Sequence, residues 1–271
     1  MTKSNSGEDI IQVTDLVKKY GGLTAVDNIS FTVRTGEIFA FLGPNGAGKT
    51  TTIKMLTTLL KPTQGHILLN GHDPVRKQRE VRRSFGIVFQ DPSLDNELTA
   101  YENMVFHAVL YSIPKKIWQE RIKELLELVQ LWDRRNDQVK KYSGGMKRRL
   151  EIARGLLHLP KILFLDEPTL GLDPQTRNLL WEHIRALNEK EHITVFFTTH
   201  IMEEAERVAD TVAVIDHGKI IAWGSARELE EQTGTDSLEE AFLALTGKAI
   251  REEGAESKNQ MVGRMLRRGR W

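Results

Sequence analysis

A glycine-rich segment between an apolar strand and a helical pattern constrains this chain more than any other feature. Residues 43–50 read GPNGAGKT and fit the pattern G-x-x-x-x-G-K-[ST]. The segment follows the apolar run IFAFL and opens a helix expected over residues 49–60, which is the setting that the pattern requires. Strands that alternate with helices in this way indicate an α/β fold with a parallel sheet.

The residue types in this segment, called the phosphate loop below, suit the binding of a nucleotide triphosphate. Glycines let backbone amides converge on phosphate oxygens, and the helix N-terminus adds positive partial charge. Lys49 can reach the outer phosphates, and the Thr50 hydroxyl can bind Mg²⁺. The candidate binding residues here are Gly43, Pro44, Asn45, Gly46, Ala47, Gly48, Lys49, Thr50 and Thr51.

A second signal is the run ILFLDE, an apolar strand that ends in Asp166 and Glu167. Beside a phosphate loop, the aspartate can hold Mg²⁺ directly or through water, and the glutamate can orient or deprotonate an attacking water. Acidic pairs that follow strands are commonly solvated loop residues. The phosphate loop upstream favours the catalytic interpretation, with ATP and Mg²⁺ as the expected ligands.

Hydrophobic periodicity places the remaining elements. Strands are expected at residues 10–14, 29–33, 37–42, 66–70, 85–89, 161–165, 194–198, 211–215 and 219–222. Helices are expected at residues 49–60, 101–111, 115–130, 146–157, 174–189 and 202–209. Capping boxes are expected at Thr99 with Glu102, at Ser225 with Glu228 and at Ser237 with Glu240. The stretch 92–159 has no convincing strand, and disorder is expected from residue 248 onward.

The run YSGGMKRRL at residues 142–150 resembles the signature sequence of ABC-type ATPases, with Ser143, Gly144 and Gly145 as its central residues. By physics alone the run is a serine-capped helix start whose amides could receive an anion. The resemblance covers about residues 10–224. One departure is Met146, where many members have a glutamine, because a methionine cannot donate a hydrogen bond.

The resemblance implies roles for further residues that stand in the family's order. Tyr20 matches the aromatic residue that stacks on adenine, and Gln90 matches a glutamine that senses Mg²⁺ near the transport partner. The loop at residues 171–173 matches the one that lines the dimer seam, and His200 matches the switch histidine near the γ-phosphate. Without this order, each would be interpreted as an ordinary surface or structural residue.

The family resemblance implies a fold and a domain organisation. The expected fold is an α/β P-loop NTPase core of the RecA-like kind, with an antiparallel β subdomain and an inserted α-helical signature subdomain. Residues 1–91 would carry the first part of the core with the β subdomain, and residues 92–159 the helical subdomain. Residues 160–224 would complete the core, and residues 225–271 would form a helical appendage with a basic tail.

The resemblance also implies partners. The signature of one subunit closes over the ATP of another in this family, so we expect an ATP-dependent homodimer, or a heterodimer with a paralogue. A separate integral membrane permease is expected, with this chain peripheral at the cytoplasmic face of the cell membrane. The pattern is most similar to ATPase subunits of ABC-2-type exporters, including those of the daunorubicin kind. The expected cargo is a small molecule, drug, or lipid- or polysaccharide-type substrate.

Apolar residues near Gln90 suggest where the permease docks. They could form a groove for a short helix or could simply pack the helical subdomain. These residues are Leu94, Leu98, Tyr101, Val105, Phe106, Leu110 and Tyr111. The tail from Arg264 to Trp271 could touch anionic lipid, but its composition favours a short solvated tail.

Composition excludes several other classes. With 38 basic and 37 acidic residues, the net charge of +1 argues against a protein that neutralises a nucleic-acid backbone. The absence of cysteine excludes disulfides and thiolate metal sites. No apolar run approaches the roughly 20 residues of a membrane span, and the N-terminus does not read as a signal peptide.

Two alternatives share part of this pattern. A non-transport ABC ATPase of translation or DNA repair would have the same nucleotide motifs, but such proteins usually show tandem cassettes or a long coiled-coil insertion. A P-loop kinase or GTPase would use Lys49 for phosphoryl transfer to another acceptor, but it leaves Ser143, Gly144, Gly145 and His200 without a role.

Overall fold

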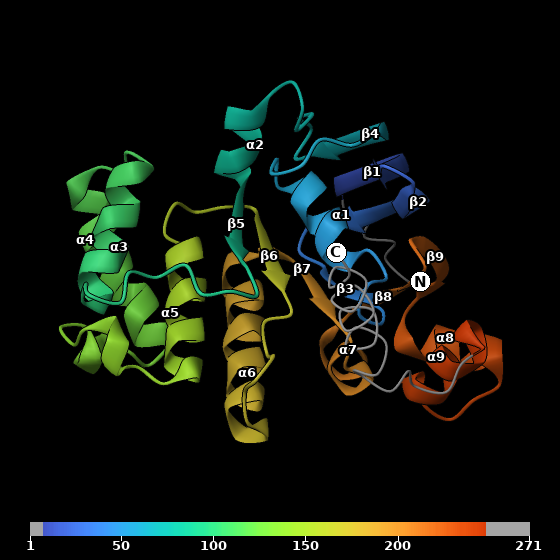
Figure 1. Ribbon diagram of the computed structural model, residues 1–271. Coiled ribbons are helices and arrows are strands. Elements are labelled where there is room, and N and C mark those ends of the chain that lie inside the picture. Colours follow the sequence, from blue (N-terminus) through green and yellow to red (C-terminus); the bar gives the residue numbers. More distant parts are fainter. Residues whose placement is uncertain (1–7, 248–271) are drawn as a thin grey trace, which may run out of the picture.

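The computed structural model describes residues 8–247. The predicted disorder after residue 247, the polar N-terminal segment and the basic tail lie outside these residues. Within them, a six-stranded sheet has the order β5-β6-β7-β3-β8-β9, and a three-stranded sheet has the order β2-β1-β4. Figure 1 shows the smaller sheet at the upper right of the larger one, with helices on both sides. The expected α/β fold with an antiparallel β part is therefore present.

The larger sheet is parallel apart from its last strand. Its strands are β5 (Phe85–Val88), β6 (Ile162–Asp166), β7 (Thr194–Thr199), β3 (Ile38–Leu42), β8 (Thr211–Asp216) and the antiparallel β9 (Lys219–Gly224). The central strands are buried along their whole length, as continuous apolar runs predict. Alternate residues serve two separate cores, so that Phe196 faces the small sheet while Val195 and Phe197 face the helices.

The small antiparallel sheet covers one face of the larger sheet. It consists of β1 (Asp9–Tyr20), β2 (Leu23–Arg34) and β4 (Gln64–Leu69). Between the two sheets, Phe31 packs on Phe39, Phe41 and Phe196, with ring centroids 5.7 to 6.0 Å apart. β1 and β2 are longer than predicted, because register shifts near Asp15 and Asn28, both at positive φ, interrupt the alternation that marks a strand.

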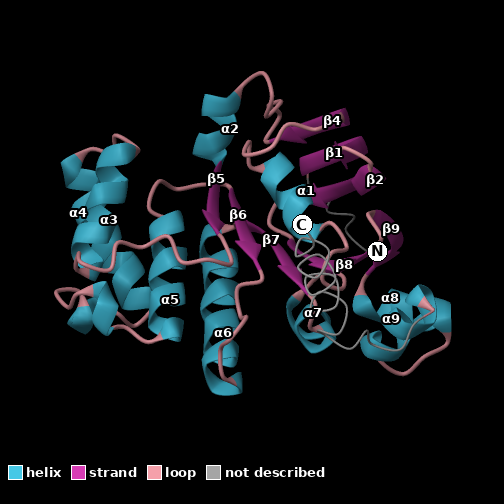
Figure 2. Cartoon of the chain, viewed as in Figure 1, coloured by secondary structure: helices cyan, strands magenta, loops and turns pink. Residues whose placement is uncertain are grey.

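Helix α1 (Lys49–Leu56) packs on the side of the small sheet, and other helices cover the opposite face and the edges of the larger sheet (Figure 2). Three of them, α3 (Ala100–Leu110), α4 (Lys115–Leu128) and α5 (Gly144–Gly155), lie between β5 and β6 in sequence and stand together at the left of Figure 1. The other helices are α1 (Lys49–Leu56), α2 (Gln78–Ser84), α6 (Pro174–Glu191), α7 (Met202–Val208), α8 (Ala226–Thr233) and α9 (Leu238–Thr246). No helix among residues 8–247 has the length and apolar character of a membrane span.

Two helices differ from the prediction. The helix expected over residues 49–60 ends at Leu56, because Thr58 takes a positive φ and the amides of Leu59 and Leu60 turn back to the Lys54 carbonyl. Helix α2 was not predicted, since its seven residues bury only Val81 and Ser84. The capping boxes at Thr99 and Ser225 are confirmed.

The third capping box forms only in part. Ser237 accepts from the Glu240 amide as predicted, but the Glu240 carboxylate accepts from the amide of Asp236 instead of that of Ser237. The carboxylate therefore still meets a free amide at the start of α9, one residue earlier than the pattern requires.

His107 of α3 and His158, which follows α5, pack close to each other. His158 stacks on Tyr111 with ring centroids 4.0 Å apart, and its Nε2 lies 2.9 Å from the Phe85 carbonyl. His107 lies 4.6 Å from Tyr111, ring to ring. Burial lowers the pKa of His107 to about 3, assisted by the charge of Arg154, and burial lowers the pKa of His158 to about 4. Both rings are therefore neutral in the folded chain near pH 7.

These histidines should make the fold sensitive to acid. Below pH about 6.5 the unfolded chain binds protons that the folded chain does not, so stability falls as the pH falls toward about 4. Each histidine contributes a slope of about 1.4 kcal/mol per pH unit in this window. We expect His107→Phe to reduce the slope, measured by urea unfolding between pH 7 and pH 4.5. An unchanged slope would contradict the assignment.

Candidate nucleotide site

The phosphate loop has a backbone that only glycine can adopt at several positions. Gly46 and Gly48 have φ values of 79° and 109°, in the left-handed region. A Cβ on Gly48 would lie 2.6 Å from the Ala25 carbonyl oxygen, and one on Gly43 would lie 2.2 Å from that of Ile215. The loop therefore runs directly against β2 and β8, and larger residues would displace it.

Lys49 begins α1 and turns its side chain back over the loop. Its Nζ donates to the carbonyl oxygens of Gly43 and Pro44, at 2.7 and 3.1 Å, and lies 3.2 Å from Glu167 Oε1. Only 4% of Lys49 is exposed. Burial lowers the pKa of this ammonium group, while the Glu167 carboxylate opposes that change. A cation is thus held at the mouth of the loop, where phosphate oxygens would lie.

Asp166, at the end of β6, forms a cluster of oxygen atoms with two threonines. Its Oδ1 accepts from Thr198 Oγ1 at 2.7 Å and from Thr50 Oγ1 at 3.2 Å. Carboxylate and hydroxyl oxygens are the ligands that Mg²⁺ prefers, usually together with water and substrate phosphates. No group of three or more acidic, histidine or cysteine side chains that could cage a metal exists among the described residues. One carboxylate beside two hydroxyl groups fits a magnesium ion that is shared with a triphosphate.

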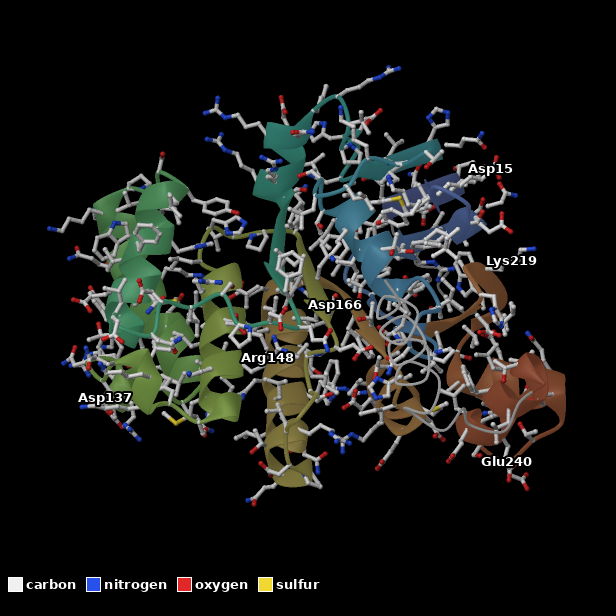
Figure 3. The ribbon with its side chains drawn as sticks, in the orientation of Figure 1. Asp15, Asp137, Arg148, Asp166, Lys219 and Glu240 are labelled. Atoms are coloured by element: carbon white, nitrogen blue, oxygen red, sulfur yellow. The ribbon has the colours of Figure 1, made fainter. Side chains whose placement is uncertain are left out.

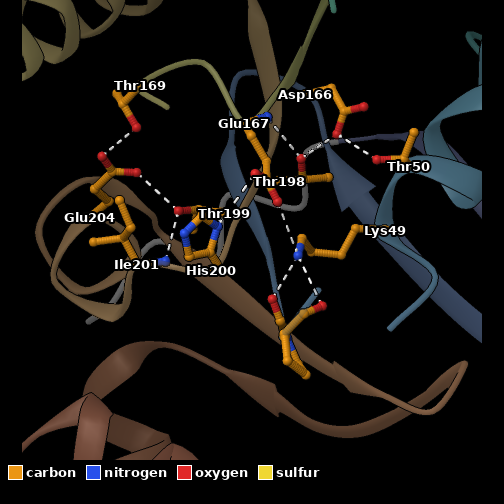
Figure 4. A network of polar contacts seen from close by, with 12 residues as sticks. Lys49, Thr50, Asp166, Glu167, Thr169, Thr198, Thr199, His200, Ile201 and Glu204 are labelled. Carbon is orange, nitrogen blue, oxygen red and sulfur yellow. Dashed lines mark hydrogen bonds and ion pairs between the residues drawn. The ribbon is translucent and has the colours of Figure 1, made fainter. Parts of the chain in front are cut away.

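Glu167 and His200 meet beside this cluster (Figure 4). Glu167 has a φ of 47°, and its amide donates to Thr198 Oγ1 at 3.0 Å, which turns the side chain away from Asp166. One carboxylate oxygen faces Lys49, and Oε2 lies 3.4 Å from His200 Nδ1. This Nδ1 makes no hydrogen bond of standard geometry within the described part of the chain. The pair can therefore reorganise around a water or a phosphate oxygen.

A cavity of 630 Å³ joins these groups. Its walls include Tyr20, which is 46% exposed, together with Gln90, Glu167 and His200. The other lining residues are Leu23, Ala25, Asn45, Gly46, Ala47, Gly48, Lys49, Thr50, Thr51 and Leu170. Gly43, Pro44 and Asp166 are absent from the walls: the first two supply carbonyls to Lys49 from behind, and Asp166 is 1% exposed beneath Thr50.

The structure does not bring Ser143, Gly144 and Gly145, called the signature turn below, to this cavity. Ser143 caps α5 by accepting from the Met146 amide at 3.3 Å. A Cβ on Gly145 would lie 2.3 Å from Thr176 Cγ2 at the start of α6. The turn therefore packs beside the loop 171–173 and outside the cavity that contains the chain's own phosphate loop.

Met146 has an apolar role in this chain. It is partly buried and packs against the core that α3, α4 and α5 share with the sheet. The residue that departs from the family pattern thus contributes packing to the helical region, and the capping bond of Ser143 uses its backbone amide alone.

Side chains of α5 hold the loop that follows β5, and sequence reasoning missed them. Arg148 donates to the carbonyl oxygens of Phe89 and Gln90, and it pairs with Glu151 at 3.3 Å. Glu151 accepts from the Ser93 amide at 2.7 Å, and Arg154 donates to the Ser93 carbonyl at 2.8 Å. In Figure 3, Arg148 extends from α5 toward the side of the molecule where Asp166 ends β6. No sequence signal separates Arg148 and Glu151 from the other charged residues of α5, which are Lys147, Arg149 and Arg154.

Comparisons with known proteins agree with this geometry. Residues 26–170 match the family model described as ABC transporter. The chain is 44% identical to the daunorubicin/doxorubicin resistance ATP-binding protein of Streptomyces peucetius, over 84% of this chain and 69% of that protein. It is 40% identical to the linearmycin resistance ATP-binding protein of Bacillus subtilis, over 90% of this chain and 76% of the relative.

Solved structures give the same result. An ATP-binding subunit of an ABC transporter superposes with a TM-score of 0.79 at 32% identity, covering 88% of this chain and 99% of the other. A dimeric ATP-binding cassette in a post-hydrolysis state, bound to ADP and Pi, superposes with a TM-score of 0.71 at 27% identity. It covers 79% of this chain and 98% of that one.

The fold and the convergent phosphate loop, carboxylates and histidine define an ATP-hydrolysing cassette, and the chain belongs to the ABC transporter ATP-binding family. Within that family its similarity to antibiotic-resistance ATP-binding proteins extends over most of the chain.

Proposed function

We propose that this ATPase powers the export of a small molecule, drug, or lipid- or polysaccharide-type compound through a separate membrane subunit. The observation that carries the proposal is the 44% identity to a daunorubicin/doxorubicin resistance protein over 84% of the chain. A Nod factor export ATP-binding protein of Ralstonia nicotianae is also 42% identical over 85% of the chain. Relatives named for chemically different compounds support export in general, with the compound selected by the membrane subunit.

The geometry supports a division of roles in hydrolysis. Tyr20 would stack on adenine, and the loop amides with Lys49 would hold the phosphates. Thr50, Asp166 and Gln90 would hold Mg²⁺, which when bound offsets the charge of the phosphate oxygens. Glu167 would accept a proton from the attacking water, and His200 would orient the water and the γ-phosphate. The products are ADP and phosphate.

Two substitutions separate binding from turnover. Lys49→Ala removes the buried cation and should abolish nucleotide binding or turnover. Glu167→Gln keeps the shape of the side chain but removes the proton acceptor, so binding should persist while turnover falls by roughly 100-fold or more. Calorimetry with Mg-ATP and phosphate release measure the two effects. Normal turnover in either variant would contradict its assigned role.

The signature turn supports an ATP-dependent dimer. In one chain it lies outside the cavity, so a second chain would have to supply it to complete the site. A cassette of similar fold is dimeric in its solved structure. Loss of the γ-phosphate would then weaken the closed state, giving a shift between two conformations that the membrane subunit can detect.

Glu167→Gln should therefore dimerise with saturating Mg-ATP and return to monomer without it, as measured by size exclusion with light scattering. The double variant Lys49→Ala with Glu167→Gln is the matched control and should remain monomeric. A Glu167→Gln chain that stays monomeric while calorimetry shows bound nucleotide would argue against the sandwich.

An exposed apolar face on α3 fits a helix of the membrane subunit. Phe106, Val109 and Leu110 are 61 to 65% exposed, and Val109 and Leu110 follow Phe106 by about one turn of α3. The predicted groove needs correction in part, because Leu94 is buried in the core and Tyr101 and Val105 pack against it. We propose docking at the Phe106, Val109 and Leu110 face, with the chain peripheral at the cytoplasmic side of the membrane.

Phe106→Asp should abolish co-purification with the membrane subunit, because a charge on the buried face of an interface opposes association. The ATPase rate of the isolated chain should remain normal. The matched control is Leu59→Asp, because Leu59 is also an exposed apolar residue, at 58%, but lies outside α3. Normal co-purification of the Phe106 variant would exclude this face as the docking site.

A further inference from the structure

One buried carboxylate outside the cavity contacts a residue near Glu167 and a residue next to His200. Glu204 lies on α7 and is 4% exposed. Its Oε2 accepts from Thr199 Oγ1 at 3.0 Å, and its Oε1 accepts from Thr169 Oγ1 at 2.5 Å. Arg177 of α6 forms an ion pair with Oε1 at 3.3 Å. The cost of burying this charge is therefore offset by one cation and two hydroxyl donors.

The first arm of this contact fixes the backbone around His200. Thr199 immediately precedes His200, and its Oγ1 also accepts from the amide of Ile201 at 3.0 Å. The Thr199 hydroxyl thus bonds to the backbone on the far side of the histidine and donates to Glu204 (Figure 4). The His200 ring is therefore attached to a backbone that this contact holds in place.

The second arm reaches the segment that follows Glu167. Thr169 lies two residues after Glu167 and two residues before Gly171, where the loop 171–173 begins. Arg177 lies in the first turns of α6, whose N-cap is Asp173 at the end of that loop. The same carboxylate therefore contacts the chain after Glu167, the helix after the loop 171–173, and the residue before His200.

We propose that Glu204 is a positioning residue for ATP hydrolysis. By holding Thr169 and Thr199 together, it sets the separation of Glu167 and His200, which is 3.4 Å in this structure. It also links that separation to the position of the loop 171–173 beside the signature turn, so that rearrangement of the loop is transmitted to His200. This inference rests on the hydrolytic roles proposed above for Glu167 and His200.

The decisive variant is Glu204→Gln, which keeps the volume of the side chain but has a single acceptor oxygen and no charge. It should lower kcat by roughly 10- to 100-fold, the usual effect of displacing a reacting group through its supporting contacts. Binding of Mg-ATP should change less than about twofold, because Lys49, Thr50 and Asp166 make no contact with Glu204. Glu203→Gln, at the exposed neighbour on α7, is the matched control and should hydrolyse ATP normally.

A second pair of variants separates positioning from general stability. Thr199→Val and Thr169→Val each remove one arm while keeping the side-chain shape, and each should lower kcat. Because both act through the same carboxylate, adding either one to Glu204→Gln should have a much smaller effect than it has alone. Thermal unfolding is recorded for every variant, and the comparison uses those that are fully folded at the assay temperature.

The outcomes distinguish this inference from the proposed function. If the wild-type chain hydrolyses ATP and folded Glu204→Gln has the same kcat, only the positioning role of Glu204 would be overturned. Parallel loss of nucleotide affinity and turnover, or full additivity with the threonine variants, would also overturn it in favour of a purely structural role. If the wild-type chain binds Mg-ATP and the Glu167→Gln variant still hydrolyses it at the normal rate, the hydrolytic assignment on which the inference rests would be overturned instead.

Discussion

The nucleotide site depends on the register of three parallel strands. β7 lies between β6 and β3, with Asp166 opposite Thr198 and Leu42 opposite Thr199. This register places the end of β6, the start of the phosphate loop and the residues before His200 at one edge of the sheet. A shift of one residue would turn each side chain to the other face of the sheet. The alternation of Phe196 with Val195 and Phe197 between two cores prevents such a shift.

Buried charge is organised around this edge in three ion pairs, two between different segments and one within α5. Lys49 pairs with Glu167 across the phosphate loop, and Glu204 pairs with Arg177 behind His200. Arg148 and Glu151 pair within α5 while they also bond to the backbone that carries Gln90. In each pair the opposite charge offsets part of the cost of burying an ionised group. The three ion pairs therefore help to fix where the segments at this edge of the sheet lie relative to one another.

Much of the fold and of the nucleotide site was predictable because it depends on local patterns. The strand-loop-helix unit at the phosphate loop, the ILFLDE strand and the strand before His200 each combine an apolar run with a functional end, and they lie where the sequence indicated. Register shifts at Asp15 and Asn28 concealed the full length of β1 and β2, because the alternation changes phase there. The short α2 has too little buried surface to give a periodic signal.

The supporting residues could not be predicted from the sequence in the same way. Glu204 stands among Glu203 and Glu206 in a helix whose pattern suggests a solvated surface, and its burial depends on Thr169 and Arg177, which lie far from it in sequence. The grip of α5 on the loop after β5 likewise joins segments that are 58 to 61 residues apart. Such contacts depend on tertiary packing, about which local periodicity contains no information.

The position of the signature turn, away from the cavity of its own chain, has a consequence for inheritance. In the proposed dimer, every nucleotide would be enclosed by elements from two different copies. A copy with a defective turn would then impair the site on its normal companion while keeping its own phosphate loop intact. In a cell that makes both versions, mixed dimers would reduce the activity by more than the fraction of defective copies, so such an allele would be partly dominant.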